Sequence, residues 1–308
     1  MVTGDRPQLR KPATSQTQTL AVIVNKILLM RKSTWSVLLA LTIISCGRTQ
    51  NIDDIKKKYI FDELNIYIEN PLRTDNNPDR YTLDNKVYRI NRNFTFDYSI
   101  IRNGDTLKIM TPKMTGPDSD FQREWNFIPN NSQHEDKIET ISITVQPGIS
   151  NDNQTMLKYE YQYIPDLGYS TFSSTSGVIE NEMNTWMHPH RDKYFMILEL
   201  NPFPFIQQPF EIGNKWTWTL EIGDHWKDER WKNWTGSIRN DYEYEIIGKE
   251  KLKTKIGEMD CWVVQSTATS SIGATGLIGY YNEDNGFVKL DYINIDKSRL
   301  TIEIKEVR

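Results

Sequence analysis

Apolar and polar residues alternate with a period of two through much of this 308-residue chain. The pattern is plain in residues 94–100 (FTFDYSI), and it recurs in residues 141–145, 157–163, 216–222, 242–246 and 300–304. Such alternation buries one face of a strand and leaves the other in water, which suits antiparallel sheets. No long stretch shows a sustained helical period of 3.6. We therefore predict an all-β fold of antiparallel sheets, as a curved sheet or a sandwich, in one or two β subdomains after a signal peptide and a short polar tether.

Turn residues separate these segments at short intervals. Asn103-Gly104 and Asn285-Gly286 are hairpin signals, because a type I′ turn needs positive φ at both central positions. Ile256-Gly257 predicts another turn, between residues 249–255 and 259–265. The sequence thus predicts strands joined mainly by hairpins.

Residues 201–210 (NPFPFIQQPF) contain three prolines, which exclude a central strand or a helix interior. The segment is either a linker between domains or an extended crossover. We place a boundary here, with an N-terminal β domain over 57–204 and a C-terminal β domain over 205–308.

Composition excludes several classes of protein. A hydrophobic fraction of 38% and a mean hydropathy of −0.61 exclude a polytopic membrane protein. The net charge is −4, so the chain as a whole lacks the excess of Lys and Arg that is typical of nucleic-acid-binding proteins. We therefore expect no nucleic-acid partner. Two cysteines exclude a disulfide framework and a multi-cysteine zinc site, and we expect no cofactor.

The first 45 residues have the features of a targeting segment. Arg31 and Lys32 precede a mostly apolar run over 35–45, which is too short to span a bilayer and has the length of a signal-peptide core. The sequence Ile43-Ile44-Ser45-Cys46 then resembles the lipobox of bacterial lipoproteins. The resemblance implies that 1–45 is a signal peptide and that Cys46 becomes the lipidated, palmitate-bearing N-terminus. It also implies a bacterial cell-envelope location, at the outer membrane or on the periplasmic face.

Met30 directly precedes the charged pair, so a start there gives a signal of ordinary length, with 1–29 a mis-assigned upstream extension. Residues 46–56 form the lipidated tether. Positions 1–45 hold six Lys/Arg and one Asp, so the mature part carries 31 basic and 40 acidic residues and a formal charge of −9. Membrane attachment would therefore depend on the acyl chains rather than on charge. Cys261 would be the remaining free thiol, which we expect to be buried and inert.

The C-terminal third resembles a group of uncharacterised secreted bacterial β-sheet proteins. The resemblance depends on Ile212–Trp218 (IGNKWTW), Gly248–Leu252, Lys255–Val264, Tyr280-Tyr281 and Gly286–Leu290. It implies an envelope β-sheet domain and transfers no catalytic residue.

His188-Pro189-His190-Arg191-Asp192 is the densest cluster of chemically active side chains. On an extended segment the side chains of His188, His190 and Asp192 share a face, and three such ligands would suit zinc. The alternative is a polar loop whose histidines bind backbone groups or water.

Three tryptophans, Trp226, Trp231 and Trp234, lie among charged residues without strand alternation. Exposed indoles beside Asp, Asn and Arg are typical of a platform that stacks on sugars or peptides. The alternative is a hairpin tip that folds back over the sheet edge.

These observations favour a lipid-anchored cell-envelope protein that is non-enzymatic and binds a ligand or partner. The ligand would be a glycan, an apolar molecule in a curved sheet, or another envelope protein. The competing hypothesis is a metal-dependent hydrolase that uses His188, His190 and Asp192.

Overall fold

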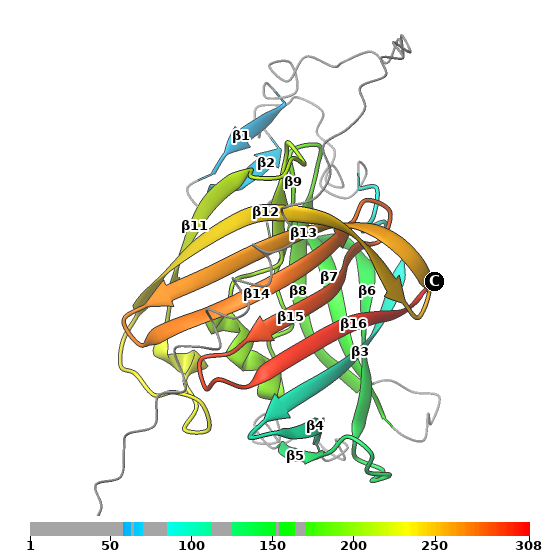
Figure 1. The fold of residues 1–308 in the computed structure, drawn as a ribbon, viewed down its shortest axis with the longest axis vertical. Coiled ribbons are helices and arrows are strands. Elements are labelled where there is room, and N and C mark those ends of the chain that lie inside the picture. Colours follow the sequence, from blue (N-terminus) through cyan, green and yellow to red (C-terminus); the bar gives the residue numbers. More distant parts are fainter. Residues whose placement is uncertain (1–57, 63–64, 70–84, 112–124, 152–153, 164–170) are drawn as a thin grey trace, which may run out of the picture. The chain divides into compact units, whose positions relative to one another are not determined.

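A single antiparallel sheet dominates the computed structural model, which describes residues 58–62, 65–69, 85–111, 125–151, 154–163 and 171–308 (Figure 1). All of them belong to the unit Gln50–Arg308. The leader, Cys46 and the whole tether lie outside the described residues.

Strands from both halves of the chain form this 14-stranded sheet, so the predicted all-β antiparallel class is confirmed. One half contains β3 (Asn93–Arg102), β6 (Ile138–Asn151), β7 (Gln154–Tyr163), β8 (Thr171–Glu180), β9 (Asn184–Met187) and β10 (Phe205–Gln207). The other contains β11 (Lys215–Ile222), β12 (Ile238–Thr254), β13 (Gly257–Ser270), β14 (Gly273–Asn282), β15 (Gly286–Ile293) and β16 (Arg299–Val307). β4 (Asp105–Met110) and β5 (Asn126–Pro129) branch from the end of β3.

The path of the chain explains the strand order. The chain runs by neighbouring strands from β3 in the centre to β10 at one edge, crosses to β11 at the other edge, and returns to the centre, where β16 pairs with β3. The proline-rich segment 201–210 leads into that crossover. The boundary that we placed at 204/205 therefore does not coincide with a break in the sheet, because strands on both sides of it hydrogen-bond within one sheet.

Alternation in the sequence becomes alternation in burial. Every second residue of β7 is buried, from Thr155 to Tyr163, and β12 alternates in the same way from Ile238 to Ile246. A register shift between Ile246 and Gly248 then interrupts the pairing of β12 with β13. The predicted turn at Asn103-Gly104 has positive φ at both residues, 53° and 92°.

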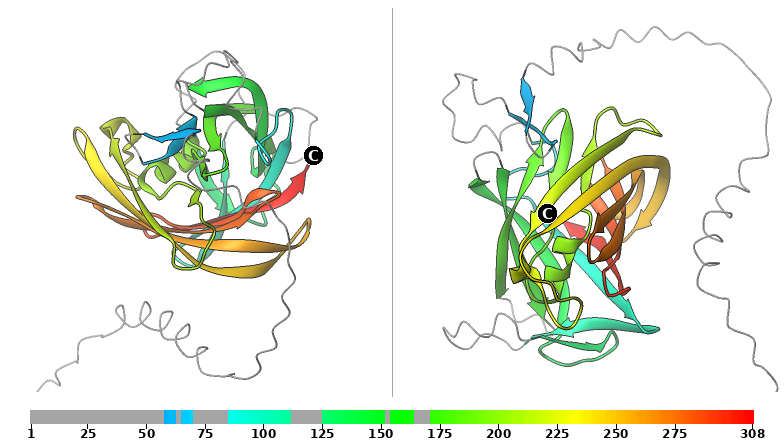
Figure 2. Two further views of the ribbon diagram at one scale, coloured as in Figure 1. Left: turned by 90° about the horizontal axis from the view of Figure 1, so that it is seen from above. Right: turned by 90° about the vertical axis from the view of Figure 1, so that its left-hand side faces the viewer.

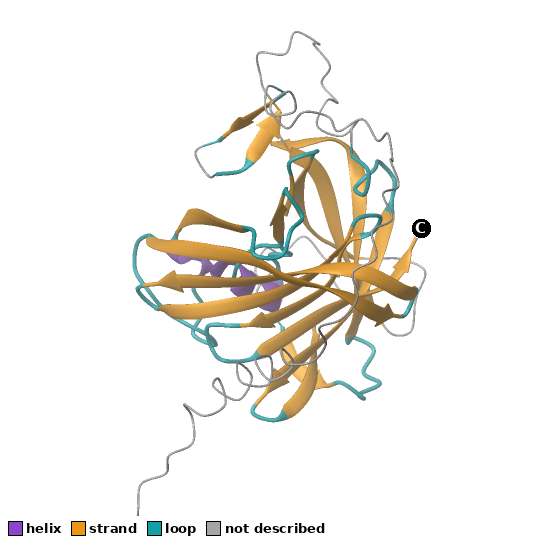
Figure 3. Ribbon diagram, turned by 45° about the horizontal axis from the view of Figure 1, so that its top comes forward, coloured by secondary structure: helices purple, strands orange, loops and turns teal. Residues whose placement is uncertain are grey.

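The sheet curves around a short 3-10 helix, η3 (Lys193–Leu200), as Figures 2 and 3 show. Seven of its eight residues are buried, so apolar side chains surround it on all sides. That uniform burial explains why the sequence shows no helical period here. A second 3-10 turn, η4 (Asp224–Trp226), follows β11.

Aromatic side chains hold the two edges of the curved sheet together. Phe205 of β10 meets Trp216 of β11 edge to face at 5.7 Å, and Trp186 of β9 meets Trp218 of β11 at 5.9 Å. Asn214, just before β11, donates from Nδ2 to the carbonyl oxygen of Gln207 over 3.1 Å. Side chains from both edges of the sheet thereby fill the interior of its curve.

A small hairpin of β1 (Tyr59–Phe61) and β2 (Tyr67–Glu69) is attached to the end of β9 and β10. The amide of Tyr67 donates to Oδ1 of Asn184 (2.8 Å), and Nδ2 of Asn181 donates to the carbonyl of Tyr67 (2.7 Å). Nε2 of Gln207 donates to the carbonyl of Asn65 (2.9 Å). These bonds fix the first described residues to this end of the sheet.

Candidate functional site

The predicted histidine cluster lies on the segment that connects β9 to η3. Among the residues that the structure describes, no three His, Cys, Asp or Glu side chains are placed to hold a metal ion. His188, His190 and Asp192 therefore do not meet at one point, because the two imidazoles are bound to different partners.

His190 is a core residue with both ring nitrogens engaged. Its ring stacks on Tyr159 at 5.0 Å, and Nε2 lies 2.9 Å from the hydroxyl of Tyr161. That hydroxyl donates its one proton to the carbonyl of Asp192 (3.1 Å), so it accepts from Nε2. Nδ1 then accepts from the hydroxyl of Ser174 (3.2 Å). Burial lowers the pKa of His190 to about 3, so the ring is neutral at pH 7.

His188 faces a buried carboxyl group that the sequence analysis missed. Its Nε2 lies 3.4 Å from Oε1 of Glu199, whose side chain is 4% exposed. Nδ1 lies 3.0 Å from the carbonyl of Pro189, and this bond assigns the ring proton to Nδ1. Nε2 is then an acceptor directed at Glu199.

Both members of this pair are neutral at pH 7. Burial raises the pKa of Glu199 to about 8, although the positive charge of Arg191 opposes the shift. Burial also lowers the pKa of His188 to about 4. The two groups are in contact but not hydrogen-bonded, because Oε1 of Glu199 has no hydrogen-bond partner among the described residues. The one signal in the sequence was an acid inside the otherwise apolar run from Tyr194 to Leu200.

Aromatic rings surround the His188–Glu199 pair. The ring of Phe203 lies 4.7 Å from that of His188, and the ring of Trp186 lies 6.0 Å away, edge on. The indole nitrogens of Trp186 and Trp218 are buried and have no hydrogen-bond partner among the described residues. The pair thus lies in a medium of low polarity, which accounts for the direction of both pKa shifts.

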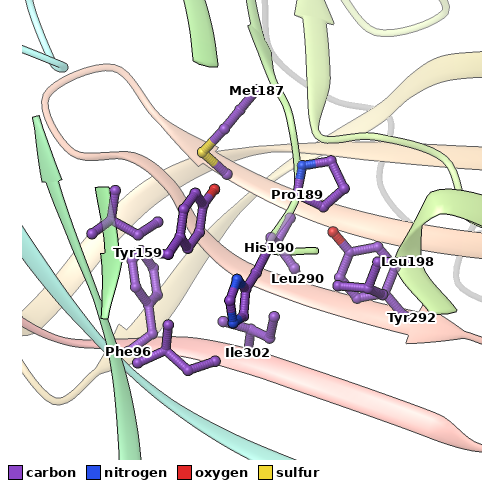
Figure 4. Close-up of a pocket in the computed structure, with 11 residues that line it drawn as sticks. Phe96, Tyr159, Met187, Pro189, His190, Leu198, Leu290, Tyr292 and Ile302 are labelled. Carbon is purple, nitrogen blue, oxygen red and sulfur yellow. The ribbon is translucent and has the colours of Figure 1, made fainter. Parts of the chain in front are cut away.

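A small cavity lies in the interior of the sheet, as Figure 4 shows. His190, Tyr159 and Tyr292 line it together with apolar side chains. Its volume is about 30 Å³, which is room for about one water molecule. The apolar ligand that we considered for a curved sheet does not fit there, because η3 and the aromatic rings already occupy the interior.

The three predicted platform tryptophans lie in the loop between β11 and β12. Trp231 is 7% exposed and Trp234 is 8% exposed, and Trp226 is partly buried against the core. We expected exposed indoles. Trp231 is instead stacked on Trp125 at 6.2 Å, and the guanidinium carbon of Arg230 lies 3.7 Å from the ring centre of Trp125. The loop folds back over the sheet, so two of the three rings are not available for stacking on a ligand.

Cys261 of β13 is buried, as expected, with 0% of its surface exposed. Burial raises the pKa of its thiol to about 11, and Asp260 and Glu250 add to the shift. A protonated, inaccessible thiol is not a nucleophile.

A larger hollow lies on the sheet surface formed by β11, β12 and β13. Its volume is about 390 Å³, within the range of small-molecule sites. Thr217, Glu243 and Thr267 form one cross-strand row along it, and Lys215, Glu245 and Gln265 form the next. Within the second row Nζ of Lys215 and Oε2 of Glu245 are 3.2 Å apart. From the sequence alone, these positions are expected only to form the solvent-exposed face of the strands.

Within the described ranges, no helix has the length and apolar character needed to cross a membrane. The chain matches no protein-family profile and no curated protein sequence.

Solved structures that are similar to this chain include the following three. A predicted lipoprotein of Parabacteroides distasonis is 10% identical with a TM-score of 0.39, and the match covers 72% of this chain and 97% of that one. A predicted exported protein of Bacteroides fragilis with a YmcC-like fold is 7% identical with a TM-score of 0.36, over 71% and 96%. The hypothetical lipoprotein YmcC of Escherichia coli is 9% identical with a TM-score of 0.29, over 69% and 84%. Similarity at this level is too low for a shared function to be inferred.

Proposed function

We propose that this chain is a lipid-anchored protein of the bacterial cell envelope that binds a polar ligand and is not an enzyme. The observation that carries the proposal is the order of features before the body: the basic pair Arg31-Lys32, the apolar run over 35–45, and Cys46 behind Ser45. Cleavage before Cys46 and acylation of its thiol and amine would anchor the body through more than one acyl chain.

The body supports binding better than catalysis. Both nitrogens of His190 are engaged by protein groups, and the thiol of Cys261 is buried. The hollow on β11, β12 and β13 instead offers hydroxyl, amide and carboxylate groups at alternate positions of adjacent strands. Such a set suits the hydroxyl groups of a glycan, because each group accepts or donates a hydrogen bond. We therefore place the ligand in this hollow.

Acylation is tested by growing the producing bacterium with radiolabelled palmitate. The mature protein should carry the label and fractionate with membranes, and the Cys46→Ser variant should lose both properties. A wild-type protein that stays unlabelled would contradict the anchor.

Ligand binding is tested by calorimetric titration with a panel of envelope polysaccharides, because the Trp216 indole lies on the buried face of β11 and would not report on the hollow. Thr217→Arg should abolish the response by filling the hollow, whereas Thr106→Arg, at an exposed position of β4, should leave it unchanged. A response that persists in Thr217→Arg would place the ligand elsewhere.

A further inference from the structure

One end of the body gathers three segments that are far apart in the sequence. They are the β1–β2 hairpin, the turn at 181–184 and the loop at 208–214, seen at the top of the ribbon in Figure 1. Hydrogen bonds join them: Asn181 and Asn184 bind Tyr67, Gln207 binds Asn65, and the amide of Gln208 donates to the carbonyl of Met183 (2.8 Å). This end is therefore one connected surface.

The two most exposed large apolar residues of the described chain both lie at this end. Ile212, in the loop before β11, is 67% exposed, and Phe61, in β1, is 51% exposed. Ile60, beside Phe61, is 37% exposed. Ile247 is 39% exposed and follows Ile246, whose backbone hydrogen-bonds to this loop. These exposed apolar side chains at one end of the body are the basis for considering that end as an interaction surface.

The chain also enters the body at this end. Lys58 is the first described residue, and it pairs with Glu182 over 3.2 Å. Only eleven residues lie between Cys46 and Lys58, so twelve Cα–Cα steps join them. A chain of that length reaches at most about 40 Å when fully extended. Acyl chains on Cys46 would therefore keep this end within about 40 Å of the bilayer.

We propose that this end of the body is a lipid-facing surface, in which Phe61 and Ile212 enter the interfacial region of the membrane. The inference rests on the proposed anchor and adds an orientation to it. Two ion pairs lie here among the described residues, Lys58 with Glu182 and Lys215 with Glu245, while Glu211 beside Ile212 is exposed. The mature chain is also acidic, so the contact depends on apolar burial and not on anionic lipid.

The test places an environment-sensitive fluorophore on a single introduced cysteine. Cys261 is fully buried and stays unlabelled, so Phe61→Cys and Ile212→Cys report on the proposed surface. Ile101→Cys is the matched control: Ile101 is 44% exposed and lies at the end of β3 beside β4, away from the hairpin (Figure 1). Each mature chain carries Cys46→Ser behind a hexahistidine tag and is attached to phosphatidylcholine vesicles through a nickel-chelating lipid.

We expect the emission at positions 61 and 212 to shift to shorter wavelength on attachment and to be quenched by brominated phosphatidylcholine. The emission at position 101 should do neither. Equal responses at all three positions, or none at 61 and 212, would overturn the proposal. A shift at 61 and 212 that depends on protein concentration and needs no vesicles would assign the surface to a second copy of the chain instead. The tag replaces the acyl chains in this experiment. The fluorescence response at positions 61 and 212 can therefore be interpreted even if palmitate labelling at Cys46 fails.

Discussion

Nε2 of His188 lies 3.4 Å from Oε1 of Glu199 inside the curved sheet, where both groups are removed from water. This environment favours the protonated form of Glu199, because burial penalises the charge of the carboxylate more than the positive charge of Arg191 stabilises it.

Glu199→Gln should remove a specific pH dependence. The pKa of Glu199 is about 8 in the folded protein against 4.5 ordinarily. Its contribution to stability is therefore complete below pH 4.5 and is lost as the pH rises to 8. Relative to the variant, the wild type should lose up to about 4–5 kcal/mol over that interval. Urea unfolding at several pH values measures the difference, and parallel curves for the two proteins would contradict the assignment.

Glu180→Ala should destabilise the fold strongly. The carboxylate of Glu180 accepts from the backbone amides of Lys86 (2.9 Å), Val87 (2.8 Å) and Tyr88 (2.8 Å). Removing it leaves these amides without an acceptor, at a cost of roughly 3 kcal/mol in the free energy of unfolding.

Glu182→Ala is the control for that variant. Glu182 lies two residues further on, and its ion pair with Lys58 is 43% exposed on each side. Loss of such a pair should cost less than about 1 kcal/mol. Equal losses in the two variants would show that Glu180 does not act through the amides.

Asp97→Asn should lower the free energy of unfolding, because it leaves the buried ammonium group of Lys108 without its carboxylate partner. Oδ1 of Asp97 binds Nζ of Lys108 (2.6 Å), and Oδ2 binds Nζ of Lys255 (2.7 Å). Lys108 is only 3% exposed, so we expect a loss of about 2 kcal/mol, reduced because Asp97 itself is 35% exposed. Lys255→Ala, at an exposed position, should cost much less.

The pH dependence of this variant follows from the same contacts. Burial acts to raise the pKa of Asp97, but the bonds from Lys108 and Lys255 outweigh it and hold the pKa below its usual value. Its contribution is thus present above pH 3.8 and is lost as the pH falls through the lowered pKa. The difference between wild type and Asp97→Asn in chemical unfolding should shrink in that acidic range, and a constant difference would argue against the ion pair.

Cys261 should be unreactive toward thiol reagents in the native protein and reactive in denaturant. Its side chain is 0% exposed and its thiol has a pKa of about 11. The Cys46→Ser chain isolates this thiol, and Ile212→Cys in that background supplies a reactive native control. Modification of native Cys261 at the rate seen in denaturant would show that β13 opens readily.

The period-two alternation of apolar and polar residues predicted the strands well. It arises because each strand buries one face, so it can be recognised without knowing which strands pair. Residues 94–100, 157–163 and 242–246 all lie in strands. The helix η3 could not be predicted in this way, because it is buried on all sides and its sequence has no period. Trp231 was placed wrongly as an exposed ring because its stacking partner, Trp125, is about a hundred residues away in the sequence. Glu199 was missed for a related reason, since its partner His188 belongs to the segment before the helix.

β16 is the last strand of the chain, yet it lies beside β3 in the middle of the sheet. The pairing of β3 with β16 therefore joins segments that are far apart in the sequence, and the centre of the sheet depends on the nine residues of β16. Pairing over such a sequence separation is slow to form. A variant that lacks only β16 would leave unpaired edges at β3 and β15, so loss of this one strand should destabilise both halves of the sheet.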